Sequence, residues 1–119
     1  MLFGINVAAT TKTIFLKKNQ EWTIGYGATR TRTVDYVSVR CYAVYPPEGG
    51  EDTYTRIQAI IRTPTGKDLC ASTVLYENAT KTTPLKIKEG YLNLVSVNVH
   101  FRGNNPIYTA EANVYYSGN

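Results

Sequence analysis

VDYVSVRCYAVY, residues 34–45, is the strongest strand signal in the chain and the main evidence for its fold class. Successive side chains of a β-strand point to opposite faces, so this stretch presents one apolar face and one polar, aromatic face. The apolar face is expected to pack into a core and consists of Val37, Val39, Cys41, Ala43 and Tyr45. The wet face consists of Tyr36, Ser38, Arg40 and Tyr42. A sheet that is packed on one side and solvated on the other is typical of antiparallel architecture.

The same alternation recurs along the chain between turn residues, and no window has a helical period. Further strands are predicted over residues 11–18, 21–29, 52–62, 68–77, 85–88, 91–101 and 107–116. We predict one hairpin around the turn at residues 63–67 and a second hairpin from the last two strands. About eight short strands at this spacing predict an all-β domain, an antiparallel β-sandwich of about seven to nine strands, with a small closed β-barrel as the alternative.

The chain of 119 residues fits one domain, which we place at residues 11–119. Residues 1–10 combine a short apolar run with small residues, so they are either a signal-peptide remnant or the first strand. Cys41 and Cys70 fall in two predicted strands, and the single histidine, His100, leaves no zinc-binding spacing. We therefore predict a Cys41–Cys70 disulfide and a location that is secreted or at the cell surface. No apolar stretch is long enough for a transmembrane helix.

Motifs for catalysis and cofactor binding are missing from the sequence. His100 lies in the middle of a predicted strand, and no serine stands in a nucleophile-elbow context. Gly25-Tyr26-Gly27 is not followed by a helix, which a phosphate-binding fingerprint requires; these glycines instead indicate a bulge or a close backbone contact. The loop EGGED, residues 48–52, has three carboxylates that could hold Ca²⁺, although its spacing matches no EF-hand and solvation explains it as well. We predict a protein that is not an enzyme and has no cofactor.

Tyrosines give the strongest functional signal, because the chain has ten of them and two, Tyr36 and Tyr42, share a wet face with Arg40. Exposed aromatic rings stack on sugars and also serve protein interfaces. We predict a ligand-binding set of Trp22, Tyr36, Arg40 and Tyr42, with a carbohydrate or a protein surface as the partner. Nucleic acid is the weaker alternative, because the net charge is only +4 and the cations are scattered along the sequence.

These features lead to three functional hypotheses. The favoured one is a secreted, non-catalytic binding module that acts at or near a cell surface on a glycan, a wall polymer or a protein. The first alternative is a basic, bacteriocin-like effector that acts on bacterial envelopes through its positive charge. The second alternative is a structural subunit that assembles by pairing exposed edge strands.

Overall fold

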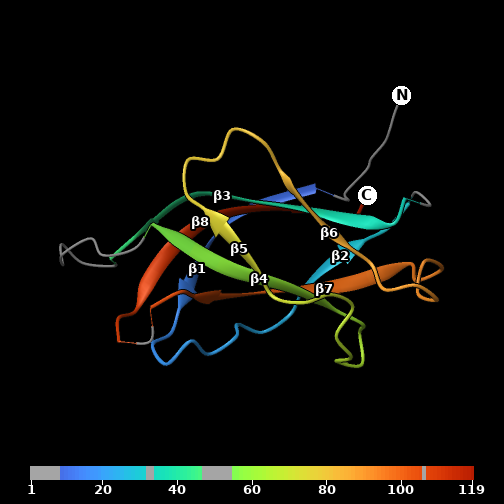
Figure 1. The fold of residues 1–119 in the computed structure, drawn as a ribbon, viewed down its shortest axis with the longest axis horizontal. Helices are drawn as coiled ribbons and strands as arrows, with labels where there is room; N and C mark the ends of the chain where they lie inside the picture. Colours follow the sequence, from blue (N-terminus) through green and yellow to red (C-terminus); the bar gives the residue numbers. More distant parts are fainter. Residues whose placement is uncertain (1–8, 32–33, 47–54, 106) are drawn as a thin grey trace.

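The computed structural model describes residues 9–31, 34–46, 55–105 and 107–119, which form eight β-strands and no helix (Figure 1). The strands are β1 (Ala9–Leu16), β2 (Tyr26–Thr29), β3 (Tyr36–Tyr45), β4 (Arg56–Arg62), β5 (Thr73–Tyr76), β6 (Thr83–Lys86), β7 (Ser96–Gly103) and β8 (Ala110–Ser117). They form two four-stranded antiparallel sheets. Sheet A has the strand order β1-β8-β3-β6, and sheet B has the order β2-β7-β4-β5.

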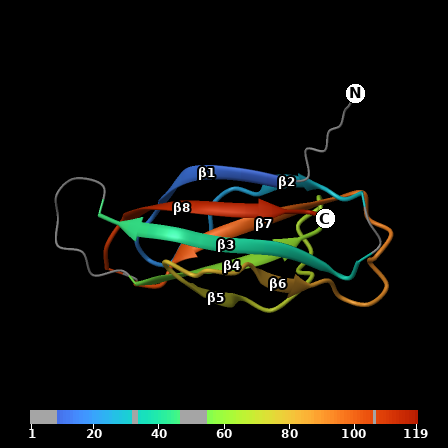
Figure 2. The same cartoon turned by 90° about the horizontal axis from the view of Figure 1, so that it is seen from above.

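The two sheets pack face to face, which confirms the predicted β-sandwich. Figure 2 shows β8 and β3 of sheet A lying over β7 and β4 of sheet B. In the described part of the chain no strand pairs from one sheet to the other, so the sheets remain open at their edges instead of closing into the alternative barrel. Of the first ten residues, Ala9 and Thr10 belong to β1, whereas residues 1–8 and the acidic loop 48–52 lie outside the described residues.

One cluster of buried side chains fills the space between the sheets. Its members come mainly from the positions that the alternation predicts, including Ile14, Leu16, Ile57, Ala59, Ile61, Val97, Val99 and Phe101. The rings of Tyr26, Phe101 and Tyr116 meet inside it with centroids 6.2 to 6.3 Å apart. Full burial of one such side chain contributes about 1.5–3 kcal/mol, so apolar burial between the sheets is the main stabilising term.

A β-bulge in β3 reverses the alternation of inward and outward side chains part-way along this strand. Cys41 pairs with Val114 and Ala43 pairs with Asn113, so Tyr42 is an extra residue with no partner of its own on β8. Beyond the bulge, Val44 is buried and Ala43 and Tyr45 are not. The prediction that Ala43 and Tyr45 face the core is therefore wrong, because one inserted residue moves every later side chain to the opposite face.

The strand pairing confirms one predicted hairpin and contradicts the other. β4 and β5 pair with each other, as expected for the turn at residues 63–67. The last two strands do not pair, because β7 lies in sheet B and β8 lies in sheet A. The connection between them crosses from one layer to the other. Alternation alone does not encode this crossing, since every half-buried strand has the same period of two.

The segment before β2 is not a strand, although it runs beside β7. The backbone N–H of Thr23 donates to the Phe101 carbonyl oxygen at 2.8 Å. A Cβ atom at Gly25 would lie only 2.8 Å from the Asn98 Cβ, which confirms the predicted close contact at that glycine. Figure 1 shows this segment, from residue 17 to residue 25, along the lower side of the molecule beneath β7.

The predicted disulfide does not form, because Cys41 and Cys70 are both free thiols. Cys41 is buried in β3 near Glu77, whose N–H donates to the Thr55 carbonyl oxygen at one end of β4. Cys70 lies beside Ile61, toward the other end of β4. Thr55 and Ile61, which mark these two positions, are six residues apart, or roughly 20 Å along the strand. A disulfide requires a Cα separation below about 7 Å.

Candidate functional site

The four predicted ligand-binding residues do not form one site. Tyr36, Arg40 and Tyr42 all lie on β3 and are half-buried, in sheet A. Trp22 precedes β2 and contacts side chains of sheet B. Because the two sheets pack through their inner faces, Trp22 is on the opposite side of the sandwich from the other three residues. The molecule therefore has two candidate binding faces.

The first is the tyrosine face, which we define as Tyr36, Arg40, Tyr42, Tyr45 and Tyr115 on the outer side of sheet A. The guanidinium carbon of Arg40 lies 4.3 Å from the centroid of the Tyr42 ring. Tyr115 is the register partner of Arg40 on β8, so its side chain is on the same face. The Nε atom of Arg40 is buried and has no hydrogen-bond partner among the described residues. This leaves one strong donor unsatisfied within a layer of aromatic rings.

Both ends of the tyrosine face have further structure. At one end, Asn113 Oδ1 accepts hydrogen bonds from Thr13 Oγ1 at 2.8 Å and from Tyr45 Oη at 3.5 Å, which links β1, β8 and β3. At the other end is a groove of about 450 Å³ beside the edge strand β6. It is lined by Asp35, Tyr36, Ser38, Thr82, Pro84 and Lys86. The face therefore runs from a fixed polar network to an open groove.

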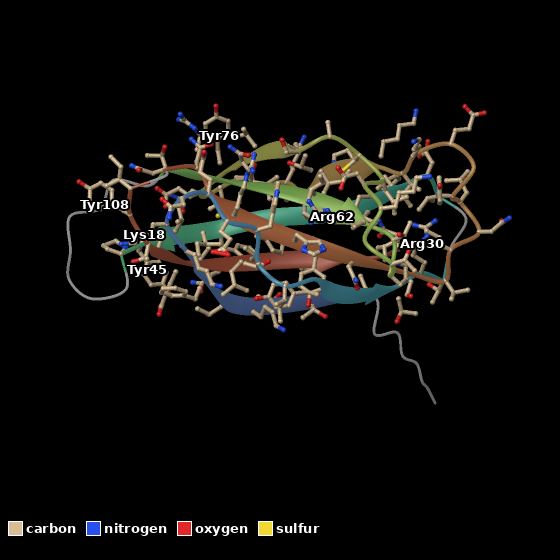
Figure 3. The ribbon with its side chains drawn as sticks, turned by 90° about the horizontal axis from the view of Figure 1, so that it is seen from below. Lys18, Arg30, Tyr45, Arg62, Tyr76 and Tyr108 are labelled. Atoms are coloured by element: carbon tan, nitrogen blue, oxygen red, sulfur yellow. The ribbon has the colours of Figure 1, made fainter. Side chains whose placement is uncertain are left out.

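The second is the arginine–tryptophan face, which we define as Trp22, Arg56, Arg62, Arg102 and Tyr76 on the outer side of sheet B. The guanidinium carbons of Arg102 and Arg62 lie 4.3 and 5.6 Å from the Trp22 ring. Arg56 lies 5.9 Å from the ring of Tyr76, which is exposed at the edge strand β5. Figure 3 views the molecule from the side of sheet B, with Arg62 over the strands and Tyr76 toward the rim.

Hydrogen bonds brace this second face. Arg102 Nε donates to Gln58 Oε1 at 2.8 Å, and Gln58 Nε2 donates in turn to Asn104 Oδ1 at 2.8 Å. Arg62 Nε donates to Asp68 Oδ1 at 2.8 Å. Ile60 points away from the core and is still only 5 % exposed, so the long side chains on this face form a covering layer over the sheet. The face is thus already ordered without a ligand.

Sequence reasoning missed most of the second face. The alternation of β4 does place Arg56, Gln58, Ile60 and Arg62 on one side, which was a usable signal. Arg102 joins them because β7 pairs with β4, with Arg102 opposite Gln58. Tyr45 and Tyr115 were missed on the first face, the former because of the bulge. Each omission involves a contact between residues far apart in the sequence.

Two further observations concern catalysis and metal binding. His100 Nδ1 lies 2.8 Å from the Thr23 carbonyl oxygen, so the ring helps to hold the segment that carries Trp22. Within the described ranges, no three His, Cys, Asp or Glu side chains are grouped so that they could hold a metal ion. The described part of the chain contains no helix that is long and apolar enough to cross a membrane.

Comparisons with known proteins supply no further constraint. No protein-family model, no curated protein and no solved structure matches the chain.

Proposed function

We propose that the protein is a non-catalytic binding module whose tyrosine face recognises a carbohydrate at or near a cell surface. The observation that carries this proposal is the row of half-buried tyrosines along β3 and β8 around an arginine with an unsatisfied donor. Tyrosine rings combine an apolar body with a hydroxyl group at the tip, which suits the apolar faces and hydroxyl rims of sugars. The protein would be exported to meet such a ligand.

The shape of the face favours an extended ligand. Tyr36 and Tyr42 are six residues apart, which corresponds to roughly 20 Å along a strand. Small molecules bind in clefts that enclose most of their surface. The tyrosine face is a layer on a sheet with a groove beside β6 at one end, so it suits an oligosaccharide that lies along β3.

Arg40 indicates the polar group that such a ligand supplies. A buried donor without a partner is unfavourable by about 1–3 kcal/mol. Once the Arg40 side chain turns to uncover Nε, a hydroxyl or carboxylate oxygen of a sugar placed against Tyr42 would accept the hydrogen bond that this atom lacks among the described residues. The bond to a carboxylate would be the stronger one, because it is charge-assisted.

The test is binding to a glycan array that carries neutral and carboxylated oligosaccharides, with the double variant Tyr36→Ala/Tyr42→Ala. We expect the wild-type protein to bind and the double variant to lose at least about tenfold in affinity. The melting temperature should fall by no more than a few degrees, about 4 °C. The matched control is Tyr108→Ala, an exposed tyrosine that belongs to neither of the two faces. Unchanged binding by the double variant, or no binding by the wild type, would exclude this function.

The effector alternative draws support from the three arginines gathered on sheet B. An envelope-active protein would inhibit bacterial growth and release dye from anionic vesicles. Our proposal predicts neither effect. Export itself is tested separately, by locating the protein in culture medium, surface and cell fractions of its source.

A further inference from the structure

We propose that the arginine–tryptophan face is a second binding surface, and that its ligand is an anionic polysaccharide. This surface is distinct from the tyrosine face and lies on the opposite side of the sandwich. Three arginines from two neighbouring strands lie on this face: Arg56 and Arg62 on β4 and Arg102 on β7. Within the described residues, Asp68 is the only carboxylate that forms an ion pair with any of them. The face therefore carries an excess of positive charge that a polyanion would neutralise.

The arginines are arranged in a row. Arg56 and Arg62 are six residues apart on β4, which corresponds to roughly 20 Å. Arg102 stands opposite Gln58 and so lies between them along the strand direction. A single small anion could reach only one or two of these positions, whereas an extended chain of charged sugars could contact all three.

The guanidinium groups are also held in place before any ligand arrives. Arg102 and Arg62 both use Nε for their hydrogen bonds to Gln58 and Asp68, and both rest against the ring of Trp22. Their terminal N–H groups have no hydrogen-bond acceptor among the described residues. Paired terminal donors match the two oxygens of a carboxylate or sulfate group. Because the side chains are already ordered, binding loses little rotamer entropy.

The occupied tryptophan distinguishes this surface from a nucleic-acid site. Binding of single strands relies on open aromatic rings on which bases stack. Here two guanidinium groups already lie against Trp22, and Tyr76 is the one exposed ring of the face. A polymer of charged sugars needs the cations and not a stacking platform, so the geometry favours the polysaccharide.

The test measures the binding of the full chain to heparin, a sulfated polysaccharide, and to polygalacturonate, a carboxylated one, with neutral dextran as the blank. The variant is Arg62→Gln/Arg102→Gln. The control is Lys18→Gln/Lys81→Gln, which removes the same charge from two exposed lysines elsewhere. We expect the arginine variant to lose at least about tenfold in affinity and the control to lose less than about threefold. Binding should weaken as the salt concentration rises from about 50 to about 500 mM.

A second variant distinguishes a loss of binding from a loss of folding. Arg56 is exposed and lies against the exposed ring of Tyr76, so Arg56→Gln should leave the fold intact and lower the affinity by about threefold. Equal losses in the arginine variant and the lysine control, or stronger binding to single-stranded oligothymidylate or anionic vesicles than to either polysaccharide, would overturn the proposal. The Tyr36→Ala/Tyr42→Ala variant should keep its heparin affinity. Failure of the tyrosine face and failure of this one are therefore observed separately.

Discussion

The two outer faces of the sandwich are built from the same strand pattern and differ in how completely their polar side chains are hydrogen-bonded. On the arginine–tryptophan face, charged and aromatic side chains brace one another through Trp22, Gln58 and Asp68. On the tyrosine face, Arg40 rests against Tyr42, but its Nε donor finds no acceptor in the described part of the chain. The arginine–tryptophan face is therefore braced by its own contacts, whereas the tyrosine face keeps one buried donor that no described residue satisfies.

The largest expected effect comes from the residue that ties the two sheets together. Arg30 is buried and donates to the carbonyl oxygens of Val34 at 2.8 Å, Gly118 at 3.1 Å and Leu94 at 3.2 Å, which lie next to strands of both sheets. Arg30→Ala removes all three bonds, at about 1 kcal/mol each or more. We expect the free energy of unfolding, measured in urea, to fall by at least about 3 kcal/mol.

Arg30→Lys should recover part of this loss, and Arg56→Ala, an exposed arginine, should change stability by less than about 1 kcal/mol. A loss below about 1 kcal/mol for Arg30→Ala would show that the back-to-back arrangement of the faces does not depend on this residue.

Alkaline pH should lower the stability of the protein, because the sheet that carries the tyrosine face buries the Cys41 thiol on its inner side. Burial raises the pKa of the Cys41 thiol from its ordinary value of 9.0 to about 12, and the nearby charge of Glu77 adds to the rise. The unfolded chain therefore loses this proton at lower pH than the folded protein does. The contribution of Cys41 to stability is constant below pH 9.0 and is lost as the pH rises toward about 12. We expect a fall of about 1 kcal/mol per pH unit in that window.

The measurement is urea unfolding at several pH values between 8 and 11, with Cys41→Ala as the comparison. Burial also raises the pKa of Cys70 and of Tyr116, so the variant should show a shallower slope and not a flat one. An identical slope in both proteins would mean that the Cys41 thiol ionises in the folded state as easily as in the unfolded chain.

A smaller loss of stability is expected when one aromatic side chain is removed from each face. Trp22→Ala removes the ring that Arg62 and Arg102 rest against, so we expect a loss of about 2 kcal/mol. Tyr36→Ala, on the tyrosine face, should lose less than about 1 kcal/mol. Thermal unfolding of the two variants side by side gives the answer, and equal losses would remove the distinction between a braced face and an open one.

The smallest effect on stability concerns the edge between the faces. Lys12 lies on the edge strand β1, and its ammonium group sits 4.6 Å above the Tyr26 ring. A charge directed inward at a sheet edge discourages pairing with another chain. Lys12→Val should leave stability within about 0.5 kcal/mol and produce self-association in sedimentation velocity. Thr11→Val is the control. Association of the wild-type protein at the same concentrations would instead favour the structural-subunit hypothesis.

Much of the core was predictable from the alternation, as Ile57, Ala59 and Ile61 illustrate, because each is fully buried on the expected face of β4. The same rule placed Tyr36, Arg40 and Tyr42 together on the outer face of β3. It failed for Tyr45, because the bulge at Tyr42 inserts one residue and the sequence there has no glycine to mark it. The disulfide prediction was wrong for a different reason, because the separation of two cysteines along the chain does not reveal their separation in space.

That the chain forms half-buried strands, and which side chains of most strands face inward, could be read from the sequence, because side-chain alternation is a local property of extended backbone. Which strands are neighbours became known only from the folded arrangement. It separated β7 from β8, placed Arg102 beside Arg62 and Trp22, and moved Trp22 away from the tyrosines. Strand partners follow from how connections cross between layers and from the fit of the shared core, and neither is written in any short stretch of residues.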